Sequence, residues 1–108
     1  ITVEPNKPLS YAFCSDTEYF PEIKTIIKNV DTLYHESTFL NDKEALAKTT
    51  KHSTAQQAAK IAEMAQVKNL IIGHFSNRYK NKNDFLTEAK NVFKNTDLAE
   101  EGKIFEIK

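Results

Sequence analysis

Residues 53–74, STAQQAAKIAEMAQVKNLIIGH, decide the fold. Alanines recur at helical spacing through the first part, which predicts a helix whose narrow stripe of small side chains lies close to a sheet. We expect Ser53 as the N-cap of this helix, with Gln56 reaching back to complete a capping box. The continuous apolar run at residues 69–72 predicts a strand that is buried on both faces. The stripe consists of Ala55, Ala58, Ala59, Ala62 and Ala65.

Upstream of this stretch, strands and helices alternate in the same way. After a short extended segment at residues 1–4, residues 9–14 (LSYAFC) and 32–35 each combine apolar or aromatic residues with a polar turn at their end. These patterns predict two strands. Pro21 suits the first turn of a helix between them, and another helix is expected at residues 42–48. The first of these helices carries Ile23, Ile26, Ile27 and Val30 at helical spacing.

The downstream part predicts one more helix and one more strand. Asn83 is expected to cap the helix, and the alternating residues 103–107 (KIFEI) predict a closing strand. Because no repeat or linker interrupts the chain, we expect residues 1–108 to form a single unit. The alternation of strands and helices predicts the α/β class with a largely parallel sheet. The inward side chains of the last helix are expected to be Phe85, Leu86, Ala89, Val92 and Phe93.

Composition excludes several classes of protein. The 108 residues include 15 Lys+Arg and 15 Asp+Glu, and 40% are hydrophobic, which is typical of a globular domain rather than a disordered chain. The zero net charge argues against nucleic-acid binding through overall charge but leaves a local basic patch open. Two glycines exclude a glycine-rich phosphate loop, and one cysteine excludes a disulfide framework. With no membrane-length apolar run and no visible signal peptide, we expect a cytoplasmic protein without membrane association.

Residues that can bind a metal ion or transfer a proton follow the predicted strands. Ligands of open α/β sheets bind beyond the carboxyl ends of the strands. Asp16, Glu36 and His74 come at the ends of three strands, and His52 precedes a helix in a loop that can reach the same edge. Because His35 and Glu36 are neighbours in a strand, their side chains point to opposite faces. Only one of the two can face the site, and we favour Glu36.

Each of these residues has a functional and a structural interpretation. Asp16 could bridge two cations or cap a turn. His74 could bind zinc through a neutral imidazole or lie buried against the backbone. Glu36 could orient a histidine by hydrogen bonding or be an exposed turn residue. His52 could act as a general acid or be a solvated loop histidine.

Positive charge gathers in the segment after the last of these residues, FSNRYKNK at residues 75–82. Arg78 is the only arginine of the chain, and arginine suits bidentate recognition of phosphate. Tyr79 could stack on a base. The alternative is a solvated loop that is held in place by its tyrosine.

Four phrases occur in the order FCSDT (13–17), YHESTF (34–39), KHSTAQQAA (51–59) and GHFSNRY (73–79). Together they resemble the ribonuclease Z family, the tRNA 3′-processing endonucleases of the metallo-β-lactamase superfamily. The resemblance extends from about residue 9 to the end of the chain. It implies that the chain is the C-terminal half of an αββα sandwich, a mixed sheet covered by helices, and that the N-terminal half is absent.

The resemblance also implies a role for each candidate residue. Asp16 is similar to the carboxylate that bridges two zinc ions, and His74 is similar to a ligand of the second zinc. His52 resembles the catalytic histidine that protonates the leaving 3′ oxygen, and Glu36 resembles the carboxylate that orients this histidine. Their chemistry would be hydrolysis of a phosphodiester, with two zinc ions per full-length subunit lowering the pKa of a bridging water toward about 7.

The substrate implied by the resemblance is a tRNA precursor, whose 3′ trailer would be removed. Ser76 and Arg78 would hold the substrate phosphate. The superfamily's main metal motif, His-x-His-x-Asp-His, is absent from this chain, and so is the projecting arm that grips the tRNA. Asp16 and His74 alone cannot give two zinc ions full coordination.

The chain, which begins at Ile1 rather than at methionine, is therefore expected to be a piece that is inactive by itself. Its expected partners are precursor tRNA, the missing N-terminal half and a second copy of the protein in a homodimer. Two other functions stay open. One is a different phosphodiesterase of the same superfamily, and the other is a non-catalytic, stand-alone α/β binding module.

Overall fold

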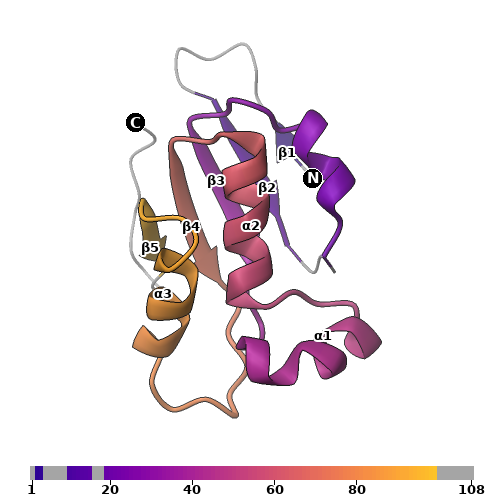
Figure 1. Ribbon diagram of the computed structural model, residues 1–108, viewed down its shortest axis with the longest axis vertical. Coiled ribbons are helices and arrows are strands. Elements are labelled where there is room, and N and C mark those ends of the chain that lie inside the picture. Colours follow the sequence, from indigo (N-terminus) through magenta and orange to yellow (C-terminus); the bar gives the residue numbers. More distant parts are fainter. Residues whose placement is uncertain (1, 4–9, 16–18, 100–108) are drawn as a thin grey trace.

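In the computed structural model, which describes residues 2–3, 10–15 and 19–99, five strands form one sheet in the order β1-β2-β3-β4-β5 (Figure 1). Strands β2 to β5 run parallel, and β1 pairs with β2 in the antiparallel direction. The predicted α/β class with a largely parallel sheet is confirmed. The strands are Thr2–Val3 (β1), Tyr11–Cys14 (β2), Thr32–Glu36 (β3), Asn69–Gly73 (β4) and Thr96–Leu98 (β5).

The connecting helices gather on one face of the sheet. The helical elements are two 3₁₀-helices, Pro21–Thr25 (η1) and Asn41–Lys43 (η2), and three α-helices, Glu44–Thr50 (α1), Ala55–Ala65 (α2) and Asn83–Lys90 (α3). Because consecutive parallel strands are also neighbours, each crossover moves in the same direction and brings its helix to the same side. Helix α2 packs against η1, α3, β3 and β4, in front of the sheet in Figure 1. Within the described ranges, no helix is long and apolar enough to span a membrane.

Helix α2 packs the core through its alanine stripe, as the sequence predicts. The five alanines of the stripe and Ile61 are fully buried. Leu33 of β3 and Leu70 of β4 are fully buried as well, in the same core cluster. Small side chains on the helix allow its backbone to approach the sheet closely while the interior stays densely packed.

The capping box of α2 lies one residue later than predicted. Thr54 is the N-cap: its hydroxyl accepts from the Gln57 N–H at 3.1 Å, and the Gln57 side chain accepts from the Thr54 N–H at 3.0 Å. The T-x-x-Q spacing fits the motif as well as the predicted S-x-x-Q does. Ser53 is left outside the helix because its own N–H donates to Glu36 at 3.2 Å.

The helical segment between β2 and β3 is shorter than the helix that the sequence predicts. Pro21 does begin a helical segment, but this segment is the single 3₁₀ element η1. Asn29 adopts a left-handed φ of 64° and donates to the Ala65 carbonyl at 2.8 Å, which ends helical geometry. Ile26, one of the four apolar residues at helical spacing, is 62% exposed. The buried members of the predicted set are Ile23, Ile27 and Val30.

Other predicted elements differ from the structure in detail. The helix expected at residues 42–48 is present as η2 followed by α1. Helix α3 has Lys82 at its N-cap position, and the predicted cap, Asn83, is its first residue. The N–H of Asn83 is satisfied by the Asn81 side chain at 3.0 Å.

At the C-terminal end, β5 was not predicted because three residues are too few to show alternation. The strand predicted at residues 103–107 lies outside the described residues. Of the side chains predicted to face inward from α3 and beyond, Phe85 and Ala89 are buried, and Leu86, Val92 and Phe93 are partly buried.

The opposite face of the sheet exposes aromatic surface. Phe13 is 43% exposed, and its ring stacks on Tyr34 with centroids 4.5 Å apart. Tyr11 and Ile71 share this face and are only partly buried. The prediction that β4 is buried on both faces is therefore wrong for the described residues. Contiguous exposed apolar surface of this kind often marks an interface.

His35 is fully buried on the helix-covered face of β3. Its Nδ1 donates to the carbonyl of Glu36 at 2.8 Å, and its Nε2 has no hydrogen-bond partner among the described residues. Burial disfavours the charged imidazolium and lowers the pKa of His35 below its ordinary value of 6.5. Folding therefore favours the neutral form of this histidine.

We expect the free energy of unfolding to fall as the pH drops below about 6.5. In this range His35 binds a proton more readily in the unfolded chain than in the folded chain. One such histidine contributes at most about 1.4 kcal/mol per pH unit to the slope. Urea unfolding from about pH 7.5 to about pH 5 measures this slope. A His35→Leu variant should show a shallower pH dependence than the wild type, and equal slopes would contradict this account.

Candidate active site

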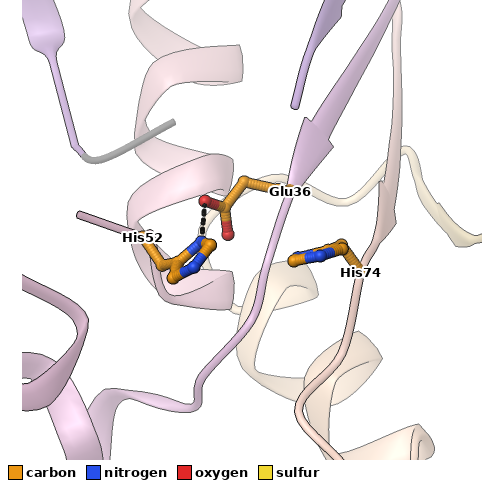
Figure 2. Close-up of side chains that lie close together, drawn as sticks. All are labelled: Glu36, His52 and His74. Atoms are coloured by element: carbon orange, nitrogen blue, oxygen red, sulfur yellow. Dashed lines mark hydrogen bonds and ion pairs between the residues drawn. The ribbon is translucent and has the colours of Figure 1, made fainter. Parts of the chain in front are cut away.

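Three segments that are distant in the sequence meet at the carboxyl ends of β3 and β4. Glu36 is the last residue of β3, His74 directly follows β4, and His52 lies in the loop between α1 and α2. The N–H of Ser37 donates to the Gly73 carbonyl at 2.7 Å and holds the two strand ends together. Figure 2 shows the Glu36 carboxylate directed at His52, with His74 beside the pair. Potential ligand atoms of the three side chains lie within 4.8 Å of one another.

Glu36 is a fully buried carboxylate surrounded by four hydrogen-bond donors. Its Oε1 accepts from His52 Nδ1 at 2.8 Å. Its Oε2 accepts from the Thr38 hydroxyl at 2.6 Å and from the N–H groups of Thr38 and Ser53, each at 3.2 Å. An ionised carboxylate has about four acceptor positions. The four donors, three on Oε2 and one on Oε1, together compensate the buried charge.

His52 connects this buried carboxylate to solvent. Because an ionised carboxylate only accepts, His52 Nδ1 carries the hydrogen of the contact, and Nε2 faces away from Glu36. The His52 side chain is 23% exposed. A histidine held at one nitrogen by a carboxylate and accessible at the other can act as a general acid or base. His52 also borders an open pocket of about 580 Å³, together with Tyr19, Glu44, Ala45, Lys48 and Gln57.

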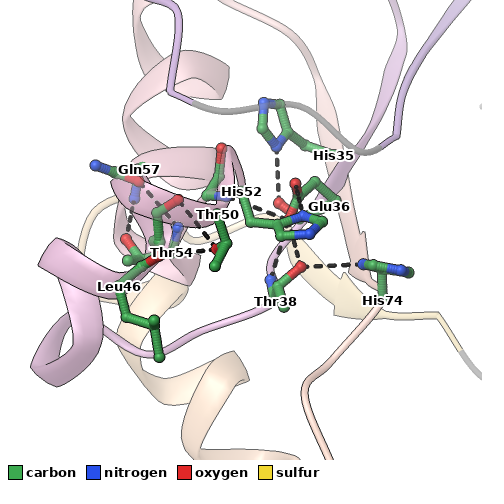
Figure 3. A network of polar contacts seen from close by, with 11 residues as sticks. His35, Glu36, Thr38, Leu46, Thr50, His52, Thr54, Gln57 and His74 are labelled. Carbon is green, nitrogen blue, oxygen red and sulfur yellow. Dashed lines mark hydrogen bonds and ion pairs between the residues drawn. The ribbon is translucent and has the colours of Figure 1, made fainter.

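His74 is joined to Glu36 through Thr38. The Thr38 hydroxyl lies 3.0 Å from His74 Nδ1 as well as 2.6 Å from Glu36 Oε2 (Figure 3). His74 has a left-handed φ of 62°, which is uncommon for a residue with a Cβ. The rings of His52 and His74 have centroids 5.5 Å apart, so both imidazoles border the same small space.

Among the described residues, Glu36, His52 and His74 are close enough together that they could hold a metal ion. Oε2 of Glu36 accepts from three donors and Oε1 accepts from His52, which favours an orienting part for this carboxylate over metal ligation. The imidazoles of His52 and His74 would contribute at most two nitrogen ligands, whereas a structural or catalytic zinc takes three to four protein ligands. Asp16, the other predicted ligand, lies outside the described residues.

Ser76 and Arg78 lie in the loop next to this site. The N–H of Ser76 donates to the Thr38 carbonyl at 2.9 Å, so the loop is attached to a residue that also hydrogen-bonds Glu36. The Arg78 Nε donates to the Ser76 hydroxyl at 3.3 Å, and its guanidinium lies 5.5 Å from the centroid of the Phe39 ring. Both predicted phosphate-binding side chains are thus neighbours at the same edge of the sheet.

Tyr79 anchors this loop to the protein. Its hydroxyl donates to Asp42 at 2.9 Å and accepts from the Leu40 N–H at 3.1 Å. Its ring packs edge-on against Phe85, with centroids 5.1 Å apart. Burial is the main reason that the pKa of Tyr79 is raised. The interpretation of a loop held by its tyrosine therefore fits better than that of a base-stacking platform.

Thr38 is the site residue that the sequence analysis missed. In the sequence it looked like part of a polar turn after β3. The spacing of Thr38 from Glu36 could have indicated this role, because residues two positions apart in extended backbone share a face. Glu36 and Thr38 have this spacing, so the hydroxyl falls on the same side as the carboxylate.

The substitution Glu36→Gln tests the donor network. The amide keeps the shape of the side chain but replaces one acceptor oxygen with a donor that faces other donors. We expect a loss of about 1–3 kcal/mol in the free energy of unfolding, measured by urea titration. Glu88→Gln is the matched control, since Glu88 also accepts from two backbone N–H groups but is only partly buried. A Glu36→Gln variant as stable as the wild type would contradict the network.

Comparison with known proteins gives one consistent result in sequence. No protein-family model matches the chain. Ribonuclease Z of Porphyromonas gingivalis is 52% identical over 101 residues, which is 94% of this chain and 33% of that protein. Ribonuclease Z of Cytophaga hutchinsonii is 50% identical over 101 residues, or 94% of this chain and 32% of that protein. The chain thus spans about one third of the length of the curated relatives that it matches.

Solved structures agree with the predicted fold. The metallo-β-lactamase fold protein YhfI from Bacillus subtilis superimposes with a TM-score of 0.84 at 23% identity, covering 92% of this chain and 40% of that protein. Human tRNase Z, short form, gives a TM-score of 0.62 at 29% identity, covering 79% of this chain and 27% of that protein. The predicted metallo-β-lactamase-type fold is confirmed, as is the resemblance to ribonuclease Z.

Proposed function

We propose, from the homology of this chain to about one third of ribonuclease Z, that it is part of a zinc-dependent endoribonuclease. The whole protein would remove the 3′ trailer from tRNA precursors in the cytoplasm by phosphodiester hydrolysis. The observation that carries the proposal is the hydrogen-bonded pair of Glu36 and His52, which lies beside His74 at the carboxyl edge of the sheet.

In this proposal His52 is the general acid of the reaction. The buried Glu36 carboxylate holds His52 at Nδ1 and stabilises the positive charge of its protonated ring. The opposite nitrogen, Nε2, then donates its proton to the 3′ oxygen as the phosphorus–oxygen bond breaks. The 3′ oxygen leaves as a neutral hydroxyl group, which is a far better leaving group than an alkoxide.

His74 and Asp16 are this chain's proposed contribution to two zinc ions. Imidazole nitrogen and carboxylate oxygen are both common zinc ligands, and Thr38 holds His74 in place at its other nitrogen. When bound, zinc supplies a nucleophile near neutral pH and stabilises charge on the phosphate. Two side chains do not satisfy two ions, so the remaining ligands would come from outside these 108 residues.

Ser76 and Arg78 are the proposed phosphate contacts. Arg78 is exposed and already held at its Nε by the Ser76 hydroxyl, so its guanidinium is partly ordered before substrate arrives. A planar guanidinium can donate two parallel hydrogen bonds to phosphate oxygens. The Ser76 hydroxyl can add a third donor from the same side of the loop.

The exposed sheet face is the proposed contact with the missing N-terminal half of the αββα sandwich. This face carries the stacked rings of Phe13 and Tyr34. The 108 residues would then be the C-terminal half of one domain and inactive alone. A homodimer of the whole protein stays a prediction, which light scattering of the full-length protein tests.

Substitution of Phe13 distinguishes a true interface from an ordinary exposed residue. Phe13→Glu should destabilise the full-length protein by about 1.5–3 kcal/mol, because a buried Phe contributes about this much. The same change in the isolated chain should have a much smaller effect, because Phe13 is already 43% exposed there. Equal effects in the two proteins, measured by chemical unfolding, would contradict the proposed contact.

Cleavage by the full-length protein tests the proposed function. A precursor tRNA with a 3′ trailer should be cut at one position, the activity should disappear with a chelator and return with zinc, and the isolated chain should be inactive. Cleavage of a small phosphodiester without cleavage of the precursor would favour another phosphodiesterase of the superfamily. Inactivity on both substrates with zinc loaded would favour a binding module.

A further inference from the structure

We infer that Thr38 is a positioning residue that fixes the tautomer of His74 and leaves Nε2 as the nitrogen for metal binding. The tautomer of the neutral His74 ring follows from the two contacts of the Thr38 hydroxyl. The consequence for metal binding rests on the proposed function.

The argument begins with a count of hydrogens around Thr38. The Glu36 carboxylate can only accept, so the hydroxyl hydrogen of Thr38 is used in the short 2.6 Å contact to Oε2. A hydroxyl has a single hydrogen. In its second contact, at 3.0 Å, the Thr38 oxygen must therefore accept from His74 Nδ1.

A neutral imidazole carries one N–H, and here that hydrogen is on Nδ1. Nε2 of His74 then has the lone pair, which is the form that a metal requires. The Glu36 carboxylate thus determines the orientation of two histidines: it contacts His52 directly and His74 through one hydroxyl. Figure 3 shows this continuous network, in which Thr38 lies between the carboxylate and His74.

Burial and hydrogen bonds restrict the position of Thr38 between Glu36 and His74. Its side chain is buried at 8% exposure, and its N–H also donates to Glu36 Oε2 at 3.2 Å. Its carbonyl accepts from the Ser76 N–H at 2.9 Å. A β-branched side chain has few accessible rotamers, so the hydroxyl is held between its two partners at little further entropic cost.

Nitrogen-15 NMR of the metal-free 108-residue chain tests the tautomer. Long-range proton–nitrogen correlations distinguish a protonated ring nitrogen from an unprotonated one in each histidine. We expect Nδ1–H at His74 in the wild type and in Thr38→Ser, which keeps the hydroxyl. In Thr38→Val, which is nearly isosteric, His74 should shift toward Nε2–H, the form that free imidazole prefers in water.

Two internal controls separate this effect from general disturbance. His52 should keep Nδ1–H in every variant, because its contact is with Glu36 itself. Ser37→Ala removes a neighbouring buried hydroxyl that has no partner among the described residues, and it should leave His74 unchanged. A wild-type His74 with Nε2–H overturns the inference without any variant, and so does an unchanged tautomer in Thr38→Val.

Zinc affinity of the full-length protein tests the consequence. In competition with a chelator, Thr38→Val should weaken zinc binding by about 10- to 100-fold, as for other groups that orient metal ligands. Thr38→Ser and Ser37→Ala should bind zinc as the wild type does. Unchanged affinity in Thr38→Val would overturn the metal part of the inference. A zinc-loaded wild type that cuts no precursor tRNA would instead overturn the proposed function and leave the tautomer standing.

Discussion

His52→Ala in the full-length protein is expected to slow cleavage of a precursor tRNA by about 10²- to 10⁴-fold, the usual contribution of a positioned general acid. Zinc content should stay at the wild-type level, because the proposed role of His52, which is hydrogen-bonded to Glu36, is proton donation and not metal binding. Single-turnover cleavage and metal analysis of the same preparation measure the two quantities together.

Lys51→Ala is the matched control for this variant. Lys51 is the exposed neighbour of His52 in the same loop, so its removal should leave both the cleavage rate and the zinc content nearly unchanged. Loss of zinc in His52→Ala would identify His52 as a metal ligand and contradict its assignment as proton donor.

His74→Ala is expected to lose both zinc and activity. Removal of a direct ligand should weaken zinc binding beyond the roughly 100-fold upper figure for groups that only orient ligands, and cleavage should fall with metal occupancy. His35→Leu is a useful comparison, because His35 is also a strand-end histidine but is buried on the opposite face. That variant should keep its zinc.

The two histidine variants therefore make opposite predictions for metal content. A His74→Ala protein that retains stoichiometric zinc would remove His74 from the ligand set. High zinc in the assay should partly restore activity to His74→Ala only if residual affinity remains, and it should never restore His52→Ala.

The sequence predicts the framework of the fold because that framework depends on repeated, local patterns. The alanine stripe of α2 and the apolar run of β4 are each periodic over several residues. The rule that ligands gather beyond the carboxyl ends of parallel strands then places Glu36, His52 and His74 at one edge, where the structure has them.

Features that depend on a choice between two equally suitable residues, or on contacts between distant parts of the sequence, could not be predicted. Thr54 and Ser53 fit the N-cap equally well from sequence, and the choice depends on Glu36, which binds the N–H of Ser53. The helix after Pro21 stops early because Asn29 bonds to Ala65, a residue 36 positions away in the sequence. The network through Thr38 needs the position of His74, which no local pattern gives.

The most direct test of the central claim, that Glu36 and His52 deliver a proton to the leaving 3′ oxygen, uses a substrate with sulfur in place of that oxygen. A thiolate leaves without protonation because thiols have pKa values of about 8.5. The full-length protein and its His52→Ala variant are compared on both substrates. The account predicts that the large loss in His52→Ala on the oxygen substrate shrinks to within about 10-fold on the sulfur substrate. An equal loss on both substrates would contradict the role of His52 as general acid.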